Sequence, residues 1–410
     1  MGLFFDSNTR MKRMKTNKLK QLLLITGLTL TINTYADQTQ LEQAQEFFVG
    51  TWTAGAPDGL GALKPTFPSY GIYKVRLNSD GTLLPLNHIQ VANPSWLVFA
   101  KNHQYLYATN EDNSDIFGKV SAFKIDKEGN LKFLNAVNSL GQQPTHAEIS
   151  PDNRFLFVAN YSARPGHAGV SVFAIQADGS IGKPVQKISF LKGSNASPDR
   201  QADGHAHSII FSPDKKTVYL TDLGSDLIRA YEYIPKSKQP LKKAKQLDLP
   251  FPAASGPRHL IFSKNGDYAY ATTEMGAQII VFKKVNGKYK TVQQENLTDQ
   301  MDASFKGGAG LIFSPDQHFL YAGNRRKSNE IVAYAVNQET GRLALVDRYA
   351  IGVMKTRAFA IDASGHYLIV ANVFSNTISQ FKRDLNTGKL TPTQIALQVG
   401  LPTDIKFIPK

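Results

Sequence analysis

Short apolar runs separated by polar turns recur along most of the chain, and this pattern predicts β-strands. In each repeat an apolar run meets a tight turn, and a second run rich in Tyr, Phe, Val and Leu follows. A third run and a polar turn, as in "TISQFK" and "LNTGKL", lead into a fourth run. Such runs bounded by Gly, Asn, Asp and Pro are typical of hairpin-connected strands. We therefore predict four strands per repeat, with Ser-Pro-Asp at 212–214 and 314–316 as turn residues.

The second run of each repeat ends in a small or polar residue, and the spacing between these ends gives the length of the repeat. They fall at Asn110, Asn160, Asp222, Thr273, Asn324 and Asn372. Successive ends are 50, 62, 51, 51 and 48 residues apart, so the unit is about 50 residues long. A four-stranded unit of this length without helical periodicity indicates a blade of a β-propeller.

Six complete repeats occupy residues 94–400 and leave four strand-like runs at the two ends of the chain. These runs are residues 403–409, 47–53, 71–77 and 86–92. Together they supply one further blade, and a ring closed in this way leaves no open sheet edge. We predict an all-β fold over residues 47–410, a seven-bladed β-propeller with four-stranded antiparallel blades, closed by pairing of the N- and C-terminal strands.

The first 36 residues have the order of a secretory signal peptide. Basic residues from Arg10 to Lys20 precede a mostly apolar run from Leu22 to Ile32 and a cleavage-site pattern ending at Ala36. We predict cleavage after Ala36, a leader over residues 37–46, and a periplasmic or secreted protein without stable membrane insertion. The alternative, an uncleaved anchor, is disfavoured because the run is shorter than the roughly 20 residues of a span. Without cysteine, packing alone must hold the fold in an oxidising compartment.

The basic charge of the chain is moderate once the predicted signal peptide is removed. The whole chain carries a formal charge of +14, and the segment 1–36 contains six Lys/Arg and one acidic residue, which leaves +9. The basic residues are scattered apart from the stretch between Lys236 and Lys245, whereas nucleic-acid binding needs a basic stripe. We expect no nucleic-acid partner and some attraction for anionic ligands.

Polar and charged residues gather where the first strand of a repeat begins and the second ends. Because these strands are antiparallel, both positions lie on one face, and the first strands line the central channel. The residues predicted at this rim are His205, His207, Asp222, Arg258, His259, Glu274, Asn324, Arg325 and Arg357. Other repeats carry Trp96, Asn160 and Gly310 at equivalent positions. Such asymmetry on a symmetric scaffold favours a ligand site.

Two non-catalytic interpretations of the rim stay open. Arg258 and Glu274 can form an ion pair that only ties a strand to a loop. His205 and His207 have the spacing of a two-histidine metal site, with Glu274 or Asp222 as the carboxylate. The nearby arginines argue against a cation, so we expect neither a metal nor a cofactor. The sequence lacks a Gly-x-Ser-x-Gly elbow, a phosphate-binding Gly-Lys-Ser/Thr loop, a dinucleotide fingerprint and a His-Glu-x-x-His motif.

After residue 46 the sequence resembles the lactonase family of seven-bladed propellers, which includes propeller-type 6-phosphogluconolactonases and the fungal carboxy-muconate lactonising enzyme. The segments that carry the resemblance are FVGTWT, NPSWLVF, HAHSIIFSPD, DLGSD, GPRHLIFS, TTE, AGNR, RAFAIDASGHYLIVAN and SNTIS…RDLNTGKL. The resemblance implies as catalytic groups a histidine of HAH (His205 or His207), Arg258, Glu274 and Arg325. The predicted export and a Gly/Pro-rich insertion at 54–69 depart from a cytoplasmic phosphogluconolactonase.

From the rim and the resemblance we predict a lactone hydrolase for a sugar lactone or another small acidic lactone. Ring opening needs a base, a ligand for the oxyanion and an acid. We expect Glu274 or a histidine as the base and Arg258 as the oxyanion ligand, with Arg325 holding a carboxylate or phosphate. The predicted further substrate-binding residues are His259, Arg357, Asp222 and Asn324. The alternatives are a lactone-forming cycloisomerase and a non-catalytic envelope propeller.

Substitution of Glu274 by Gln is expected to lower turnover by roughly 10²-fold or more, the scale for losing a general base. Because the predicted site lies at a wetted rim, folding is expected to stay nearly unchanged.

Overall fold

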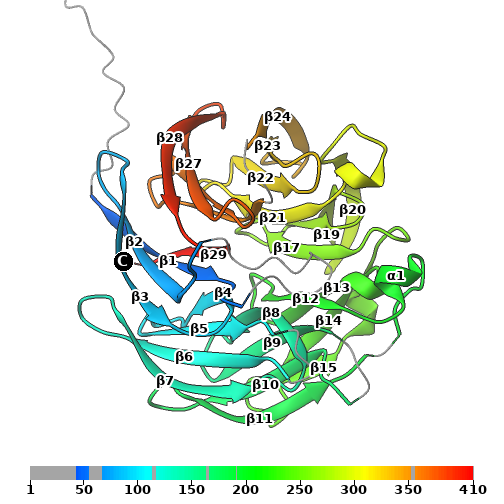
Figure 1. Ribbon diagram of the computed structural model, residues 1–410. Helices are drawn as coiled ribbons and strands as arrows, with labels where there is room; N and C mark the ends of the chain where they lie inside the picture. The colour runs from blue at the N-terminus through cyan, green and yellow to red at the C-terminus, as the bar shows by residue number, and fades with distance from the viewer. Residues whose placement is uncertain are drawn as a thin grey trace, which may run out of the picture. The chain divides into compact units, whose positions relative to one another are not determined.

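Seven antiparallel sheets surround a common axis in the computed structural model (Figure 1). The structure describes residues 43–54, 67–112, 117–162, 166–190, 192–351 and 356–409. The predicted signal peptide, most of the leader and most of the Gly/Pro-rich insertion lie outside these residues. We number the sheets as blades 1 to 7 and list the strands of each blade from the innermost outward.

Blades 1 to 4 are built from both ends of the chain and from its first half. Blade 1 contains β29 (Pro402–Phe407), β1 (Gln45–Thr51), β2 (Gly71–Leu77) and β3 (Leu83–Gln90). Blade 2 contains β4 (Pro94–Phe99), β5 (Tyr105–Asn110), β6 (Lys119–Ile125) and β7 (Leu131–Asn138). Blade 3 contains β8 (Gln142–Ile149), β9 (Phe155–Ser162), β10 (Val170–Ile175) and β11 (Ile181–Ile188). Blade 4 contains β12 (Ala206–Phe211), β13 (Thr217–Asp222), β14 (Leu227–Tyr233), β15 (Leu241–Lys243) and β16 (Leu249–Pro250).

Blades 5 to 7 follow the same order. Blade 5 contains β17 (Pro257–Phe262), β18 (Tyr268–Thr273), β19 (Gln278–Val285) and β20 (Lys288–Asn296). Blade 6 contains β21 (Gly308–Phe313), β22 (Phe319–Asn324), β23 (Glu330–Val336) and β24 (Leu343–Ala350). Blade 7 contains β25 (Thr356–Ile361), β26 (Tyr367–Asn372), β27 (Thr377–Arg383) and β28 (Leu390–Gln398). The short helices are α1 (Pro198–Gln201), η1 (Leu223–Ser225), η2 (Lys245–Leu247) and η3 (Ala303–Phe305).

The ring is closed as predicted, because the last strand of the chain pairs with the first. Phe47 lies opposite Phe407 and Val49 opposite Ile405 in the antiparallel ladder between β1 and β29. The innermost strands contact one another in the order β4, β8, β12, β17, β21, β25 and β29, and β29 returns to β4. The seven-bladed, four-stranded propeller predicted from the repeat is therefore confirmed.

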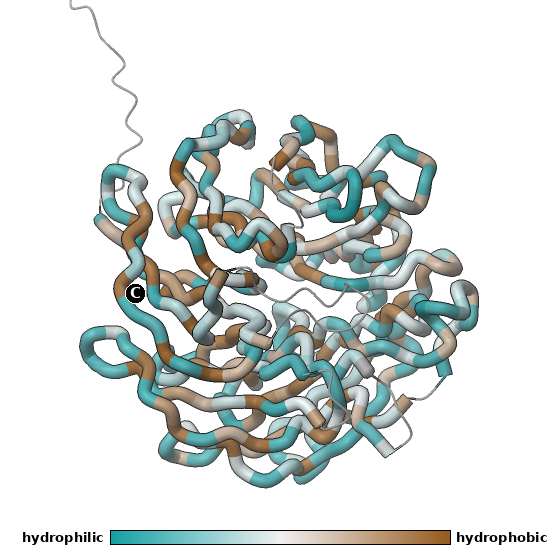
Figure 2. The backbone as a smooth tube through the Cα atoms, viewed as in Figure 1, coloured by the Kyte–Doolittle hydropathy of each residue, from teal (hydrophilic) through white to brown (hydrophobic). Residues whose placement is uncertain are grey.

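Burial differs between the inner and the outer strands of a blade. Every residue of β18, β22 and β26 is buried, since both faces of these strands are covered by neighbouring blades. The outermost strand β28 instead alternates between exposed and partly buried residues, as expected for a half-covered strand. The backbone coloured by hydropathy shows a related contrast, with brown apolar positions along the strands and many teal polar positions in the turns (Figure 2). The hydrophobic core therefore lies between blades.

The outermost strand of blade 4 departs from the simple pattern, because it is split into β15 and β16 by η2. At the break, the Asp248 carboxylate accepts the backbone N–H of Ala230 at 2.8 Å and replaces a lost ladder bond. An edge strand tolerates such an interruption since only one of its sides is paired. This irregularity lies at the outer edge of the blade, away from the inner strands.

Candidate active site

A β-bulge interrupts the pairing at the start of the innermost strand in each blade. In blade 5 Pro257 pairs with Thr273 and His259 pairs with Thr272, so Arg258 is the extra residue. Bulges re-aim side chains and recur next to active sites. The bulge residues of blades 1 to 7 are Thr403, Ser95, Thr145, His207, Arg258, Ala309 with Gly310, and Arg357. The same backbone device thus presents ionisable side chains in blades 4, 5 and 7 and small ones in the other four.

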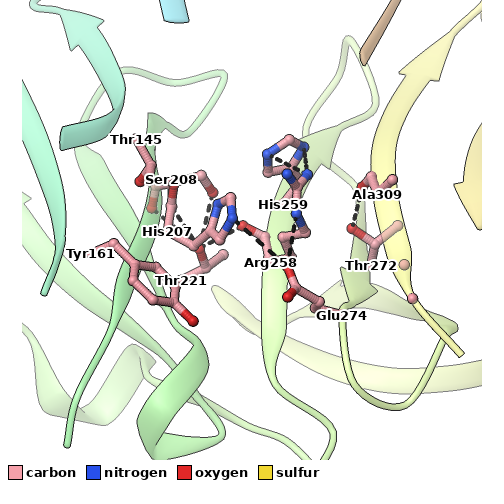
Figure 3. A network of polar contacts seen from close by, with 12 residues as sticks. Thr145, Tyr161, His207, Ser208, Thr221, Arg258, His259, Thr272, Glu274 and Ala309 are labelled. Atoms are coloured by element: carbon pink, nitrogen blue, oxygen red, sulfur yellow. Dashed lines mark hydrogen bonds and ion pairs between the residues drawn. The ribbon is translucent and has the colours of Figure 1, made fainter. Parts of the chain in front are cut away.

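Threonines of the preceding blade hold the backbone of two of these bulges (Figure 3). The Oγ1 hydroxyl of Thr221 donates to the carbonyl oxygen of Arg258 at 2.8 Å. In the same way Thr145 donates to the carbonyl oxygen of His207 at 3.1 Å. Contacts between neighbouring blades therefore fix the two bulges, and through them the positions of the His207 and Arg258 side chains.

On the second strand, the residue directly after the last pair before the bulge completes the rim; in blade 3 this residue still belongs to β9, and in the other blades it follows the strand end. In blades 1 to 7 this residue is Trp52, Glu111, Tyr161, Leu223, Glu274, Arg325 and Val373, respectively. A loop between blades 3 and 4 adds one further guanidinium group to the rim. We call the ionisable side chains that meet here the rim cluster, which consists of Glu111, Arg200, His207, Arg258, Glu274, Arg325 and Arg357.

Glu274 is the centre of the rim cluster and contacts three guanidinium groups. Its Oε2 atom lies 3.1 Å from Nε of Arg258 and 2.8 Å from Nη2 of Arg325. Its Oε1 atom lies 3.0 Å from Nη2 of Arg200. The Arg258 side chain is only 2% exposed and that of Glu274 is 15% exposed, so solvent screens these ion pairs weakly. The predicted ion pair between Arg258 and Glu274 is thus one part of a larger network.

The charges around Glu274 decide its protonation state. Burial raises the pKa of Glu274, but its three arginine partners together outweigh burial and hold the pKa well below its ordinary value. The carboxylate is therefore ionised at neutral pH and is a weak base. Burial, together with the charge of Arg325, lowers the pKa of Arg258 to about 9, so its guanidinium is still charged at neutral pH.

His207 is a neutral imidazole beside this carboxylate. Its Nε2 atom lies 3.9 Å from Oε2 of Glu274, and its side chain is 7% exposed. Burial, followed by the charge of Arg258, holds the pKa of His207 well below its ordinary value. Among the described residues its buried Nδ1 atom has no hydrogen-bond partner. This imidazole is therefore uncharged at neutral pH and has a nitrogen that can accept a proton.

The other predicted histidines have different surroundings. His205 stacks on the ring of Tyr161 with a centroid distance of 4.5 Å, and its Nδ1 atom lies 2.7 Å from the Tyr161 carbonyl oxygen. His259 lies beside His207, with ring centroids 5.4 Å apart, and its Nε2 atom is 3.0 Å from Nη1 of Arg258. The structure therefore places His207, and not His205, next to Glu274.

Arg357 belongs to the rim cluster but pairs with a different carboxylate. Its guanidinium lies over the Trp52 ring, 4.3 Å from the ring centroid, and its Nη2 atom donates to Oε2 of Glu111 at 3.1 Å. The indole N–H of Trp52 donates to the same Glu111 oxygen at 3.0 Å. Trp52, Glu111 and Arg357 thus form a second polar group on blades 1, 2 and 7.

Asp222 and Asn324 are fully buried at the predicted positions, and both side chains accept hydrogen bonds from nearby protein groups. Asp222 accepts two hydrogen bonds from Arg229, at 2.8 and 2.7 Å, and one from the backbone N–H of His205. Asn324 accepts from the N–H of Gly307 at 2.9 Å. These contacts support the ends of β13 and β22.

Sequence reasoning missed four residues that contact the predicted ones, namely Trp52, Glu111, Tyr161 and Arg200. One signal for Glu111 was present, because it follows Asn110 in "ATNE" as Glu274 follows Thr273 in "ATTE". The position of Arg200 had no such signal, since it lies in the loop that lengthens one repeat to 62 residues and has no counterpart in the repeat pattern.

No group of three or more histidine or acidic side chains in the described ranges is arranged to hold a metal ion. In the same part of the chain, no helix is long and apolar enough to cross a membrane.

Comparison with known proteins finds similarity over nearly the whole propeller. The family described as "Lactonase, 7-bladed beta-propeller" matches residues 47–407. A 6-phosphogluconolactonase of Formosa agariphila is 33% identical, covering 81% of this chain and 93% of that protein. A 6-phosphogluconolactonase of Bacillus subtilis is 30% identical, covering 88% and 97%. The solved structure of a periplasmic gluconolactonase from Pseudomonas aeruginosa is 34% identical, with a TM-score of 0.81 and coverage of 89% and 99%.

Proposed function

Because the chain belongs to the family of seven-bladed lactonase β-propellers, we propose that it hydrolyses the ring ester of a small sugar lactone at the rim cluster. The relatives named as lactonases match almost their full length, so the similarity includes the region of the candidate site. The single observation that carries the proposal is the group formed by ionised Glu274, its three arginines and the neutral His207.

In the proposed reaction His207 is the general base. It accepts a proton from water, whose oxygen attacks the carbonyl carbon of the lactone, while a guanidinium of the rim cluster stabilises the oxyanion. The carbon–oxygen bond of the ring then breaks, and the leaving ring oxygen takes the proton back from His207. Glu274, 3.9 Å away, stabilises the imidazolium that forms between these steps. We assign the base to His207 because three arginines engage the Glu274 carboxylate, whereas the Nδ1 atom of His207 has no hydrogen-bond partner among the described residues.

The charge of the rim cluster favours an acidic lactone. Four arginines face two carboxylates, and the low pKa of His207 leaves that residue neutral, so the described cluster has two positive charges in excess. Positive charge in a weakly screened site attracts anions. We therefore favour lactones that carry a phosphate or carboxylate over neutral ones.

For the location of the protein we keep the prediction of export with cleavage after Ala36. It rests on the order of basic, apolar and small residues in the first 36 positions, and a similar structure is named a periplasmic gluconolactonase. Intact-mass analysis of the protein from the envelope fraction tests it. Asp37 is expected as the first residue, and a full-length product in the cytoplasm would contradict it.

The decisive experiment is a lactone panel on purified protein lacking residues 1–36. We expect hydrolysis of glucono-1,5-lactone or its 6-phosphate above the spontaneous rate, and a loss of roughly 10²-fold in kcat for His207→Gln. The matched control is His318→Gln, which changes an exposed histidine far from the rim. Ring closure of a carboxy-muconate without hydrolysis would instead assign a cycloisomerase, and no turnover of any lactone would favour a binding protein.

A further inference from the structure

The loop between blades 3 and 4 brings a residue to the rim cluster that no strand supplies. It connects β11 to β12 and accounts for the longest spacing between strand ends, 62 residues between Asn160 and Asp222. The helix α1 lies in this loop and is visible at the side of blade 4 (Figure 1). Arg200 is in this helix, so its position depends on how the loop is held.

Buried polar contacts anchor the loop beside Arg200. The adjacent Gln201 is fully buried and donates from Nε2 to the Leu223 carbonyl oxygen and to Oδ1 of Asp226, both at 2.8 Å. Asp226 also accepts from the hydroxyl of Ser194 at 2.9 Å. The same carboxylate accepts backbone N–H groups of the segment that leads into β17, the strand of Arg258. Asp226 therefore holds both the loop that carries Arg200 and the segment that leads to Arg258.

The guanidinium of Arg200 reaches the centre of the rim cluster. Its Nη2 atom lies 3.0 Å from Oε1 of Glu274 and donates to the hydroxyl of Tyr161 at 3.0 Å. Both contacts use one of the three guanidinium nitrogens, which together carry five N–H donors. Arg200 therefore keeps donors for a further partner while it is held in place.

Exposure distinguishes Arg200 from the other arginines of the rim cluster. Its side chain is 33% exposed, against 2% for Arg258, 7% for Arg325 and 10% for Arg357. Arg325 also donates to the Gly308 carbonyl oxygen at 3.0 Å, and Arg357 lies on an indole ring. Arg200 is thus the arginine of the cluster that an incoming solute reaches most easily.

We propose that Arg200 is a substrate-binding residue that selects lactones with an anionic substituent, a phosphate or a carboxylate. This inference rests on the proposed lactone hydrolysis and names the group that recognises the end of the substrate remote from the ring ester. Guanidinium pairs with both oxyanions through parallel N–H bonds. Glu274 holds Arg200 in position, and the excess positive charge of the cluster is balanced when the anion binds.

The test compares Arg200→Gln with the parent on a phosphorylated and a neutral lactone of the same sugar. We expect kcat/KM for the 6-phospho lactone to fall about 10- to 100-fold, mostly through KM, which is the scale of one charge-assisted bond. The neutral lactone should lose less, because Arg200 also contacts Glu274, so the ratio of the two kcat/KM values should fall by about tenfold or more. Lys192→Gln is the matched control, since it removes the same charge from an exposed position of the same loop and should change neither value.

Equal losses on both lactones would overturn the proposal, because Arg200 would then act only through Glu274. A lactone with a carboxylate in place of the phosphate distinguishes the two anions: a loss on both supports recognition of charge, and a loss on the phosphate alone assigns phosphate. Isothermal titration with glucose 6-phosphate and uncharged glucose, neither of which is a lactone, is independent of turnover. An Arg200-dependent preference for the anion without hydrolysis of any lactone would retain this inference and reject the proposed function, whereas equal binding by the parent would reject the inference.

Discussion

The innermost strands have a turn end and a rim end, and the two ends differ in how much their residue types vary from blade to blade. At the turn end, blades 3, 4 and 6 repeat one arrangement, in which a serine hydroxyl donates to an aspartate two residues on and accepts the N–H five residues on. Ser212 bonds Asp214 at 2.6 Å and accepts from Thr217 at 3.0 Å, for example. At the rim end the corresponding positions carry histidine, arginine or a small residue, depending on the blade. Residues that repeat with the fold support the fold, whereas residues that differ between blades mark the site.

Removal of the closing strand should have the largest effect on stability, because the turn ends and the rim ends of all blades depend on a closed ring. Deletion of residues 402–410 removes β29 and exposes the edge of β1, including the apolar partners Phe47 and Val49. We expect aggregation or loss of cooperative unfolding, since an exposed apolar edge strand pairs with other chains. Thermal unfolding and size-exclusion chromatography measure it. A deleted protein that unfolds like the parent would show that closure contributes little.

Substitution of Glu274 by Gln should affect both activity and stability, which changes the expectation of nearly unchanged folding. The variant leaves Arg258 and Arg325 buried without their carboxylate, and breaking a buried pair costs about 3–5 kcal/mol. Turnover should fall roughly 10²-fold, because the variant no longer stabilises the imidazolium of His207. Glu148→Gln is the control, because its partner Lys101 is 45% exposed and such pairs contribute about 0–1 kcal/mol. Unchanged stability with unchanged activity would remove Glu274 from the site.

Acid should destabilise the rim through its buried and partly buried histidines before it affects the carboxylates. Burial holds the pKa values of His146, His207 and His259 well below the ordinary value of 6.5. Nearby arginine or lysine charges act in the same direction, while Glu274 opposes them at His207. Below pH 6.5 the unfolded chain therefore binds protons that the folded chain does not, and stability falls by up to about 1.4 kcal/mol per pH unit for each histidine.

Melting temperatures at pH 7.5, 6.5 and 5.5 and constant ionic strength measure this slope. His146→Gln should reduce the slope by the share of one histidine, and the exposed His318→Gln should leave it unchanged. A melting temperature that stays constant between pH 7.5 and 5.5 would contradict the prediction that these histidines are neutral in the folded protein.

Substitutions at the turn end should have the smallest effect and should not depend on the blade. Ser212→Ala and Ser314→Ala remove the same pair of hydrogen bonds from blades 4 and 6. Each is expected to cost about 1 kcal/mol, the usual net value of such bonds, and to leave kcat/KM unchanged. Denaturant unfolding and the lactone assay check both parts. A loss of activity in one blade only would mean that the turn end also contributes to function.

The sequence alone determined the number of blades, the strand order and the ring closure. The number of blades and the strand order follow from local patterns, because hairpin strands and turns lie within about 50 residues of one another, as in the pairing of Pro257 with Thr273. The ring closure followed from the strand-like runs left over at the two ends of the chain, which pair as Phe47 with Phe407. The pattern also located the rim, since antiparallel pairing puts a strand start beside the end of its neighbour. The bulge that selects Arg258 and His207 was not visible, because it is a backbone irregularity common to every blade.

Only the tertiary structure decided which rim residues meet. Glu274 pairs with Arg200 across 74 residues of sequence, and Arg357 pairs with Glu111 across 246. Asp222 was expected at the site, yet Arg229 of its own blade binds it. Sequence patterns report neighbours within one blade, whereas contacts between blades depend on how the ring packs. The choice of His207 over His205 also needed the tertiary structure, because it depends on the contacts that each ring makes and not on the spacing of the two residues in the sequence.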